Sequence, residues 1–352
     1  NTIKKVKTDN SSTSSKKGIS EDARKINSLD KESQNSLADY YQKVKERKAE
    51  FLKNGYSENW VKLNEQAERN RAHYYKLQEE KKQLLKTSTS KKSETIQNSL
   101  KDYQKQTQSI LDGLSSIDDN FMEEVSKKRK EWLEADVKTP EQKAISDRLF
   151  NKYSVLKSKA QEKKKELAKS IAGILKKGYK SNFSIKADNV TPKAKTAFNE
   201  AKSLLDGFCG ENIEQGELSV RARGSVRAYY SHEEHAITIK SDDDFETVVH
   251  ELGHYLEHNN PDMLINSKAF LEYRTKGEEA SSLNSIMNTR GYGWSEKAKQ
   301  DKFFSAYCGK VYADATEIMS MGLQRLFTDP KKFAQEDREY FDFVIANARG
   351  EL

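Results

Sequence analysis

The first 180 residues of this 352-residue chain contain very few of the residues that interrupt helices. They hold one proline, Pro140, and five glycines, while lysine and glutamate recur throughout. Because proline and glycine are the residues that most strongly end or kink helices, this composition favours long helices. We therefore predict an α-helical stalk or bundle of antiparallel helices over residues 21–180. Residues 1–20, rich in serine, threonine and lysine, are predicted to form a flexible tail.

Residues at alternating spacings of three and four support this interpretation, since that spacing marks the seam of a coiled coil. The first seam comprises Trp60, Leu63, Ala67, Asn70, Tyr74, Leu77, Lys81 and Leu84. The second comprises Ile96, Leu100, Tyr103, Thr107, Ile110, Leu114, Ile117 and Phe121. We predict a polar turn between them, at 86–92, and we expect Asn70 and Thr107 to set the register. A third helix is predicted to begin with an N-cap at Thr139 and to run to Gly178.

The charge of the chain also changes near residue 180. Residues 1–180 carry 41 lysines and arginines against 27 acidic residues, a balance of +14, whereas residues 181–352 carry 21 against 28, a balance of −7. Together these give the net charge of +7. Two units with different partners are therefore expected. The basic half is typical of a solvated coiled-coil surface. Nucleic acid is a weaker alternative as a partner, because the basic half contains no groove-reading module.

Residues 181–352 have the pattern of a compact domain with helices and short strands. After a connector at 181–188, a helix is predicted from Pro192 to Leu205. Three short strands are predicted at 217–223, 225–230 and 235–240. Further helices are predicted at 245–258, 262–274, 295–307, 314–327 and 336–348. The fold class predicted for the chain is α+β: a long helical N-terminal region, then a mainly helical domain with a small antiparallel or mixed sheet.

The chemistry of the chain is concentrated at 250–254, with the sequence His-Glu-Leu-Gly-His, inside the predicted helix 245–258. Two histidines four positions apart lie on the same face of a helix, one turn above the other, so both imidazoles can bind one metal ion. The glutamate beside the first histidine is then placed to take a proton from water. This spacing predicts a Zn²⁺ site with His250 and His254 as ligands and Glu251 as the general base.

The third ligand must come from another part of the chain. A third histidine six residues after His254 is excluded, because that position is Asn260, and His258 lies two helical turns from the first histidine. A carboxylate on a later helix remains. Glu317 is the main candidate, and Asp314, one turn earlier, is the alternative. Three protein ligands leave one position for water.

This ligand set predicts hydrolysis of a peptide bond. Zinc lowers the pKa of a water molecule towards ~7, and Glu251 takes its proton as the water attacks a carbonyl carbon. The candidates for stabilising the oxyanion are Tyr307, Tyr312, His232 and Arg290. By analogy with other peptide-binding folds, an exposed strand, with 235–240 as the candidate, is expected to hold an extended substrate by strand addition.

The pattern His250-Glu-Leu-Gly-His254 together with Glu317 resembles the gluzincin class of zinc peptidases. The wider sequence is similar to the zincin-like domains of tailed-phage and prophage proteins, which often lie at the C-terminus of Mu F-like minor head proteins. The matching segments are 224–230, 250–257, 301–304, 307–312, 316–322 and 337–350. The resemblance covers about residues 190–350. It implies a zinc-binding, peptidase-like domain over 181–352 that is carried in a virion or a mobile element.

One position departs from the thermolysin-like pattern, in which an aspartate four residues after the ligand glutamate lies behind the metal ligands. Here that position is Met321. A ligand histidine usually donates its second ring N–H to a neighbouring acceptor that fixes its orientation. We therefore expect Asp314 or Glu257 to orient a ligand histidine instead.

Together these observations predict a zinc-dependent endopeptidase attached to a helical targeting or assembly region. Its expected partners are a protein or peptide substrate, virion or phage structural proteins, and other copies of the chain through the coiled coil. The alternative is a virion structural or assembly protein whose zinc site cleaves little. The chain has no apolar signal core and no apolar run of the ~20 residues that span a bilayer. We therefore expect it in a virion or in the cytoplasm, including a host cytoplasm into which it is delivered.

Overall fold

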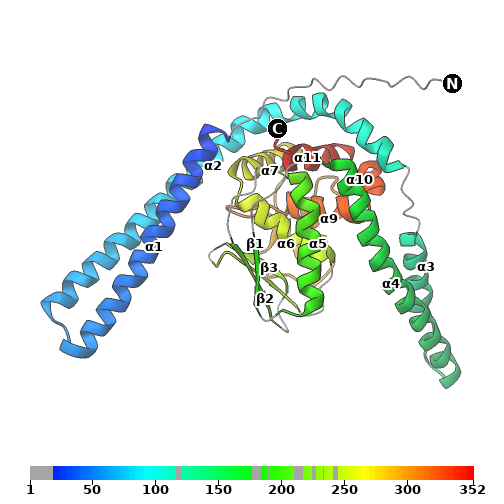
Figure 1. The fold of residues 1–352 in the computed structure, drawn as a ribbon, viewed down its shortest axis with the longest axis horizontal. Helices are drawn as coiled ribbons and strands as arrows, with labels where there is room; N and C mark the ends of the chain where they lie inside the picture. The colour runs from blue at the N-terminus through cyan, green and yellow to red at the C-terminus, as the bar shows by residue number, and fades with distance from the viewer. Residues whose placement is uncertain are drawn as a thin grey trace, which may run out of the picture.

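The computed structural model describes residues 19–115, 121–176, 184–188, 190–209, 217–223, 227–232, 234–240 and 245–352. It confirms the α+β class, because long helices are combined with a mixed sheet of four strands and a second sheet of two. Figure 1 shows two helical arms that extend from either side of a compact domain. Of the predicted flexible tail, only residues 19 and 20 lie in the described part, and Ser20 caps the first helix.

The first arm is a helical hairpin made by α1 (Glu21–Asn54) and the first half of α2 (Glu58–Ser115). The chain reverses at Gly55, whose φ of 66° is one that glycine adopts without strain. Residues of the predicted first seam, such as Ala67 and Leu77, are buried between the two helices. All the other residues of that seam are at least partly buried, as expected for antiparallel helices that pack along this stripe.

The polar turn predicted at 86–92 is wrong, because α2 continues through it as one helix of 58 residues. Tertiary contacts satisfy the polar side chains there. The hydroxyl of Ser88 is buried and donates hydrogen bonds to Asp22 of α1 and to the carbonyl of Leu84, at 2.6 and 2.9 Å. The adjacent Leu85 is buried in a small apolar cluster that α1 and a later helix complete. Local polarity indicated a turn, whereas packing keeps the segment helical.

The second arm consists of α3 (Phe121–Leu133) and the first half of α4 (Pro140–Leu175). α4 begins with the predicted cap at Thr139, which forms a complete capping box. The ring of Trp132 stacks on that of Tyr153 with 5.7 Å between centroids and joins the two helices. The predicted end of this helix, at residue 178, lies outside the described residues. No described helix combines the length and the apolar character that a bilayer span requires.

The main sheet of the domain has the strand order β1-β2-β4-β3. Its strands are β1 (Ser184–Asp188), β2 (Glu217–Ala222), β3 (Tyr229–Ser231) and β4 (Ala236–Ile239). The first three in this spatial order are parallel, and β3 runs antiparallel to β4 at the edge. β1 forms where a connector was predicted, because Ile185 and Ala187 pack against the core while β2 pairs with its backbone. Of the strand predicted at 225–230, residues 225 and 226 lie outside the described part.

Seven helices of the described chain belong to the domain itself. They are α5 (Pro192–Cys209), α6 (Phe245–His258), α7 (Pro261–Arg274), α8 (Leu283–Ile286), α9 (Ile318–Thr328), α10 (Pro330–Glu336) and α11 (Arg338–Ala348). The smaller elements are the strands β5 (Ser281–Ser282) and β6 (Lys297–Ala298) and the 3₁₀ helix η2 (Ala306–Gly309). In Figure 1 the domain helices surround the sheet beneath the bend of α2.

The helix predicted at 295–307 is wrong, because this segment contains β6 and the first half of η2 instead. β6 pairs with β5, and the chain then turns back on itself. The backbone of Gly309 packs directly on Lys299, and a Cβ at position 309 would lie 1.7 Å from the Lys299 carbonyl oxygen. Close backbone contacts therefore determine the structure of this segment, and the spacing of its apolar residues does not indicate them.

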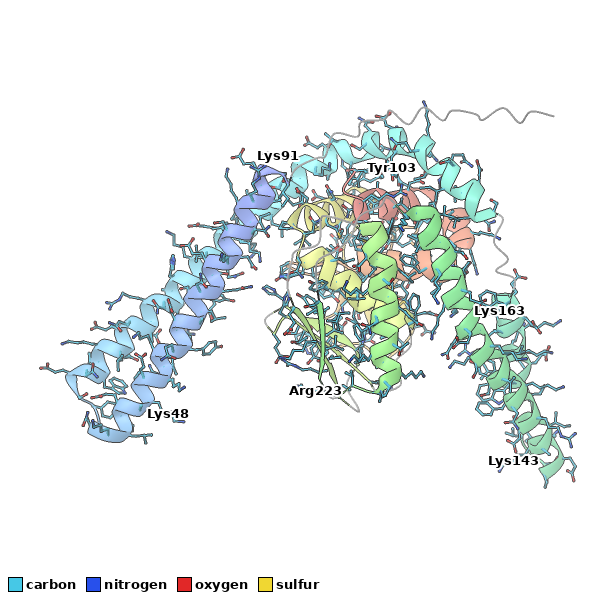
Figure 2. All side chains as sticks on the ribbon, in the orientation of Figure 1. Lys48, Lys91, Tyr103, Lys143, Lys163 and Arg223 are labelled. Atoms are coloured by element: carbon cyan, nitrogen blue, oxygen red, sulfur yellow. The ribbon has the colours of Figure 1, made fainter. Side chains whose placement is uncertain are left out.

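One apolar core joins the arms to the domain. The arms contribute Ile96, Leu100, Tyr103, Ile110, Leu114, Leu167, Ala168, Ile171 and Leu175. Thr107, predicted to set a coiled-coil register, is fully buried and donates a hydrogen bond to Asp342 of α11 at 2.6 Å. Figure 2 shows Tyr103 where α2 crosses the domain, and Lys48 and Lys143 near the far ends of the arms. The core therefore crosses residue 180, and the predicted division into a stalk and a domain at that residue stays a prediction.

Because α4 contributes to this core, Ile171→Ala is expected to lower the free energy of unfolding by about 2–5 kcal/mol through the cavity it creates. The matched control is Ile145→Ala on the same helix, where the side chain is 54% exposed and the change should be within about 0.5 kcal/mol. Urea unfolding monitored by circular dichroism measures both variants. Equal losses of stability would contradict the packing of α4 into the domain.

Candidate metal centre

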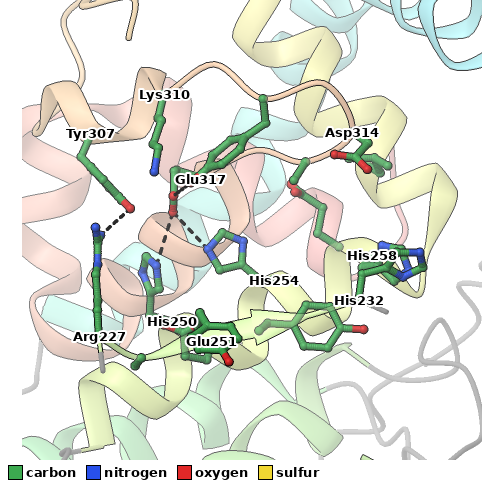
Figure 3. Close-up of a pocket in the computed structure, with 17 residues that line it drawn as sticks. Arg227, His232, His250, Glu251, His254, His258, Tyr307, Lys310, Asp314 and Glu317 are labelled. Carbon is green, nitrogen blue, oxygen red and sulfur yellow. Dashed lines mark hydrogen bonds and ion pairs between the residues drawn. The ribbon is translucent and has the colours of Figure 1, made fainter. Parts of the chain in front are cut away.

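α6 places both histidines of the motif on one side. Its apolar residues, including Val248 and Leu252, are buried in the core and fix the rotation of the helix. The imidazole rings of His250 and His254 have centroids 5.0 Å apart. Their Nε2 atoms lie 3.3 and 3.1 Å from the same oxygen, Oε2 of Glu317 (Figure 3). The structure thus brings these three residues together, with one ligand atom of each within 4.8 Å of the others.

Glu317 reaches the histidines because α9 packs closely on α6 at Gly253. A Cβ at position 253 would lie 2.5 Å from the Cα of Ser320 and 3.0 Å from its backbone nitrogen, so only glycine allows this approach. Glu317 is the N-cap residue of α9, whereas the predicted helix began at 314. Glu317 therefore lies just before the first helical residue of α9, and the turn that leads into the helix orients its carboxylate.

Two side chains hold the Glu317 carboxylate in place. The hydroxyl of Tyr312 donates to Oε1 at 2.5 Å, and the hydroxyl of Ser320 donates to Oε2 at 2.9 Å. Burial favours a higher pKa for Glu317, but the charges and hydrogen bonds of His254 and His250 hold its pKa well below the ordinary value. The carboxylate therefore stays ionised, as a metal ligand must be. Asp314, the alternative third ligand, lies on the pocket wall outside this cluster.

The group that orients His250 is Gln324 on α9. Its Oε1 lies 3.2 Å from Nδ1 of the imidazole, which leaves Nε2 as the ligand atom. Asp314 and Glu257 were the residues predicted for this task. Glu257 instead accepts hydrogen bonds from the backbone N–H and the hydroxyl of Thr316, at 2.8 and 2.5 Å. It therefore fixes the segment that leads into α9.

Glu251 is 4% exposed and lines the same pocket as the three clustered groups. Burial raises the pKa of its carboxyl group, while the charges of His254 and His250 oppose that rise. A buried carboxylate with a raised pKa beside a candidate metal site has the properties of a general base.

Tyr307 and Tyr312, both predicted to stabilise an oxyanion, line the pocket near Glu317. Burial and the nearby Glu317 carboxylate raise the pKa of each phenol, so both stay protonated and able to donate. Arg227 donates from Nη2 to the hydroxyl of Tyr307 at 2.5 Å (Figure 3). Arg227 lies in the matching segment 224–230, but the sequence alone assigned it no role, because it reaches the pocket only through the fold.

The other two residues predicted to stabilise an oxyanion lie elsewhere. His232 lines the pocket at its opposite end, beside His258, as Figure 3 shows. Arg290 is exposed on a loop and is not part of the pocket lining.

The pocket has a volume of about 440 Å³, and residues 228–230 form one of its walls. These residues belong to β3 or directly precede it, and β3 is one of the two edge strands of the main described sheet. The strand predicted at 235–240 to bind substrate is β4, which is buried along its whole length and pairs with β2 and β3. That prediction is wrong, because a strand paired on both sides has no backbone groups left for a substrate.

The donor set of the cluster fits zinc. Two imidazole nitrogens and one carboxylate oxygen are ligands that zinc takes in hydrolytic sites, whereas magnesium and calcium take mainly oxygen ligands. The hydrogen bond that His250 donates from Nδ1 to Oε1 of Gln324 also resembles the outer contacts that fix metal-binding histidines.

The chain matches no known protein family, no curated protein and no solved structure in three comparisons. The resemblance to gluzincins and to phage zincin-like domains therefore stays a prediction. Function has to be argued from the residues of the site.

Gly253→Ala is expected to separate α6 from α9, because the added Cβ would lie 2.5 Å from the backbone of Ser320. Glu317 would move away from the histidines, and zinc affinity should fall by about tenfold or more. The matched control is Gly173→Ala in α4, where an added Cβ meets nothing within 4 Å. Competition with a chelator measures the affinity. An unchanged affinity in the Gly253 variant would contradict a site built by this contact.

Zinc affinity of the metal-free chain is expected to rise with pH. Burial lowers the pKa of His254, but the Glu317 carboxylate outweighs this effect and raises its pKa to about 9. Below that pH, zinc must displace a proton from the imidazole, so affinity should increase about tenfold per pH unit from 7 to 9 and level off above. Chelator competition across this range measures the slope. A flat profile would contradict a His254 ligand that is protonated before zinc binds and loses that proton when the ion binds.

Proposed function

We propose that this chain is a zinc-dependent endopeptidase. The observation that carries the proposal is the clustering of His250, His254 and Glu317 within 4.8 Å, with Glu251 buried in the same pocket. Hydrolytic zinc sites combine three protein ligands with an adjacent base, whereas a zinc site that only stabilises the fold needs no base. Three ligands with a neighbouring carboxylate favour hydrolysis over a purely structural role.

In the proposed mechanism, the zinc ligands and the general base have separate roles. When bound, zinc supplies a Lewis acid that polarises the substrate carbonyl and lowers the pKa of water towards ~7. His250, His254 and Glu317 hold the ion. Glu251, whose pKa is raised by burial, takes the proton from the attacking water and passes it to the leaving amine.

The Tyr307–Arg227 pair is the best candidate for stabilising the oxyanion. Together they bring a phenol donor and a positive charge to one side of the pocket. Donors of this kind act on the negative charge that develops on the carbonyl oxygen. Tyr312 suits this role less well, because its hydroxyl donates to Glu317. Its role in the proposal is to position that ligand.

The substrate is an extended peptide that pairs with β3. β3 is an edge strand of the described sheet, and residues 228–230, which precede or lie on it, line one side of the pocket. Strand addition holds a peptide backbone without regard to sequence and aligns its carbonyl groups along the pocket. Tyr230 of this strand and Glu251 line the same pocket. Binding of a peptide at the edge therefore places a scissile bond beside Glu251.

The two arms would give the enzyme its location, on a phage or mobile-element particle or on a host target. The outer part of each arm exposes large apolar side chains, among them Leu52, Tyr56, Leu133 and Val137. Exposed apolar residues of this kind support binding to another protein. Self-association of the arms and attachment to virion proteins both follow from such contacts.

Glu251→Gln is expected to keep zinc and lose cleavage. The amide has the shape of the carboxylate but cannot take a proton, so turnover should fall by about 100- to 10,000-fold. Cleavage is read as new peptide ends in a host-cell lysate by mass spectrometry. The control is Glu272→Gln, which removes the same charge from an exposed position on α7. Identical peptide ends with wild type and Glu251→Gln would favour the structural, virion-assembly alternative.

A further inference from the structure

A second cluster of metal-binding side chains lies where the first arm meets the domain. It consists of Asp30 on α1, His232 directly after β3, and His258 at the end of α6. One ligand atom of each residue lies within 4.8 Å of the others. Three separate elements therefore bring a carboxylate and two imidazoles to one point.

The two imidazoles of this cluster are in direct contact, with ring centroids 3.7 Å apart. A neutral imidazole has a lone pair on one ring nitrogen, which is the form that binds a metal.

Asp30 already has a cation as its partner, with which zinc would have to compete. Lys81, a lysine within the predicted apolar seam, is buried and contacts Oδ1 of Asp30 with its ammonium group. Gln34 donates to the other carboxylate oxygen at 3.2 Å. A pocket of about 500 Å³ reaches Asp30, His232 and His258, so an ion has a path to all three from solvent.

We propose that Asp30, His232 and His258 form a second zinc site, which fastens the first arm to the domain. Two imidazole nitrogens and one carboxylate are a ligand set that suits zinc better than magnesium or calcium. Lys81 repels a divalent ion, so this site binds zinc more weakly than the cluster around Glu317. His232 and His258 also line the candidate active-site pocket, so an ion here would fix one end of that pocket against the arm.

Equilibrium dialysis of the full-length protein at buffered, saturating free zinc tests this proposal. Wild type is expected to hold two equivalents, and His232→Ala and the isosteric Asp30→Asn one each. His250→Ala, which disrupts only the first cluster, should keep the second equivalent. The matched control is His73→Ala, which removes an arm histidine that contacts Glu32 on α1 and should still leave two.

Lys81→Met provides an independent readout, because it removes the repelling charge while keeping a chain of similar length. The dissociation constant of the weaker site should fall by about five- to tenfold. One equivalent in wild type would overturn the second site, as would two equivalents in both His232→Ala and Asp30→Asn. Because His250→Ala reports on the first cluster and His232→Ala on the second, the proposed enzyme and the second site can fail separately.

Discussion

The close contact between α6 and α9 at Gly253 is the constraint on which the candidate site depends. α6 supplies two histidines and a base, but these groups do not make a site until α9 brings Glu317 against them. A side chain at position 253 would collide with the backbone of Ser320. The glycine in the middle of the motif therefore allows α6 and α9 to pack closely. The same contact lets Gln324 orient His250. The motif thus encodes a helix–helix interface as well as a ligand spacing.

Two buried carboxylates in one pocket are given different properties by their surroundings. Glu317 faces both histidines and two hydroxyl donors, so its pKa falls and it stays charged. Glu251 is desolvated against the edge strand, so its pKa rises. Opposite shifts in neighbouring acids are typical of sites that separate ligand and proton-transfer roles. This division arises from the fold, because both residues are glutamates.

Each helical arm packs against the domain at one end and extends away from it at the other. The second halves of α2 and α4 pack into the domain core, and Thr107 bonds to Asp342 across that interface. The first arm also passes the pocket, where Asp30 meets His232. The arms and the site are therefore connected mechanically, and an ion or partner that changes the position of an arm acts on one end of the pocket.

The sequence by itself determined the long helices, the α+β class and the helix that carries 250–254, because each depends on a local period or cap. The sequence also indicated Glu317 as the main candidate for the third metal ligand, beside His250 and His254. Only the tertiary structure decided that 86–92 is helical, that 184–188 is a strand and that β3 forms the sheet edge. Likewise, only the fold brought Arg227 and Gln324 to the pocket. These outcomes depend on contacts between distant residues, which local spacing cannot encode.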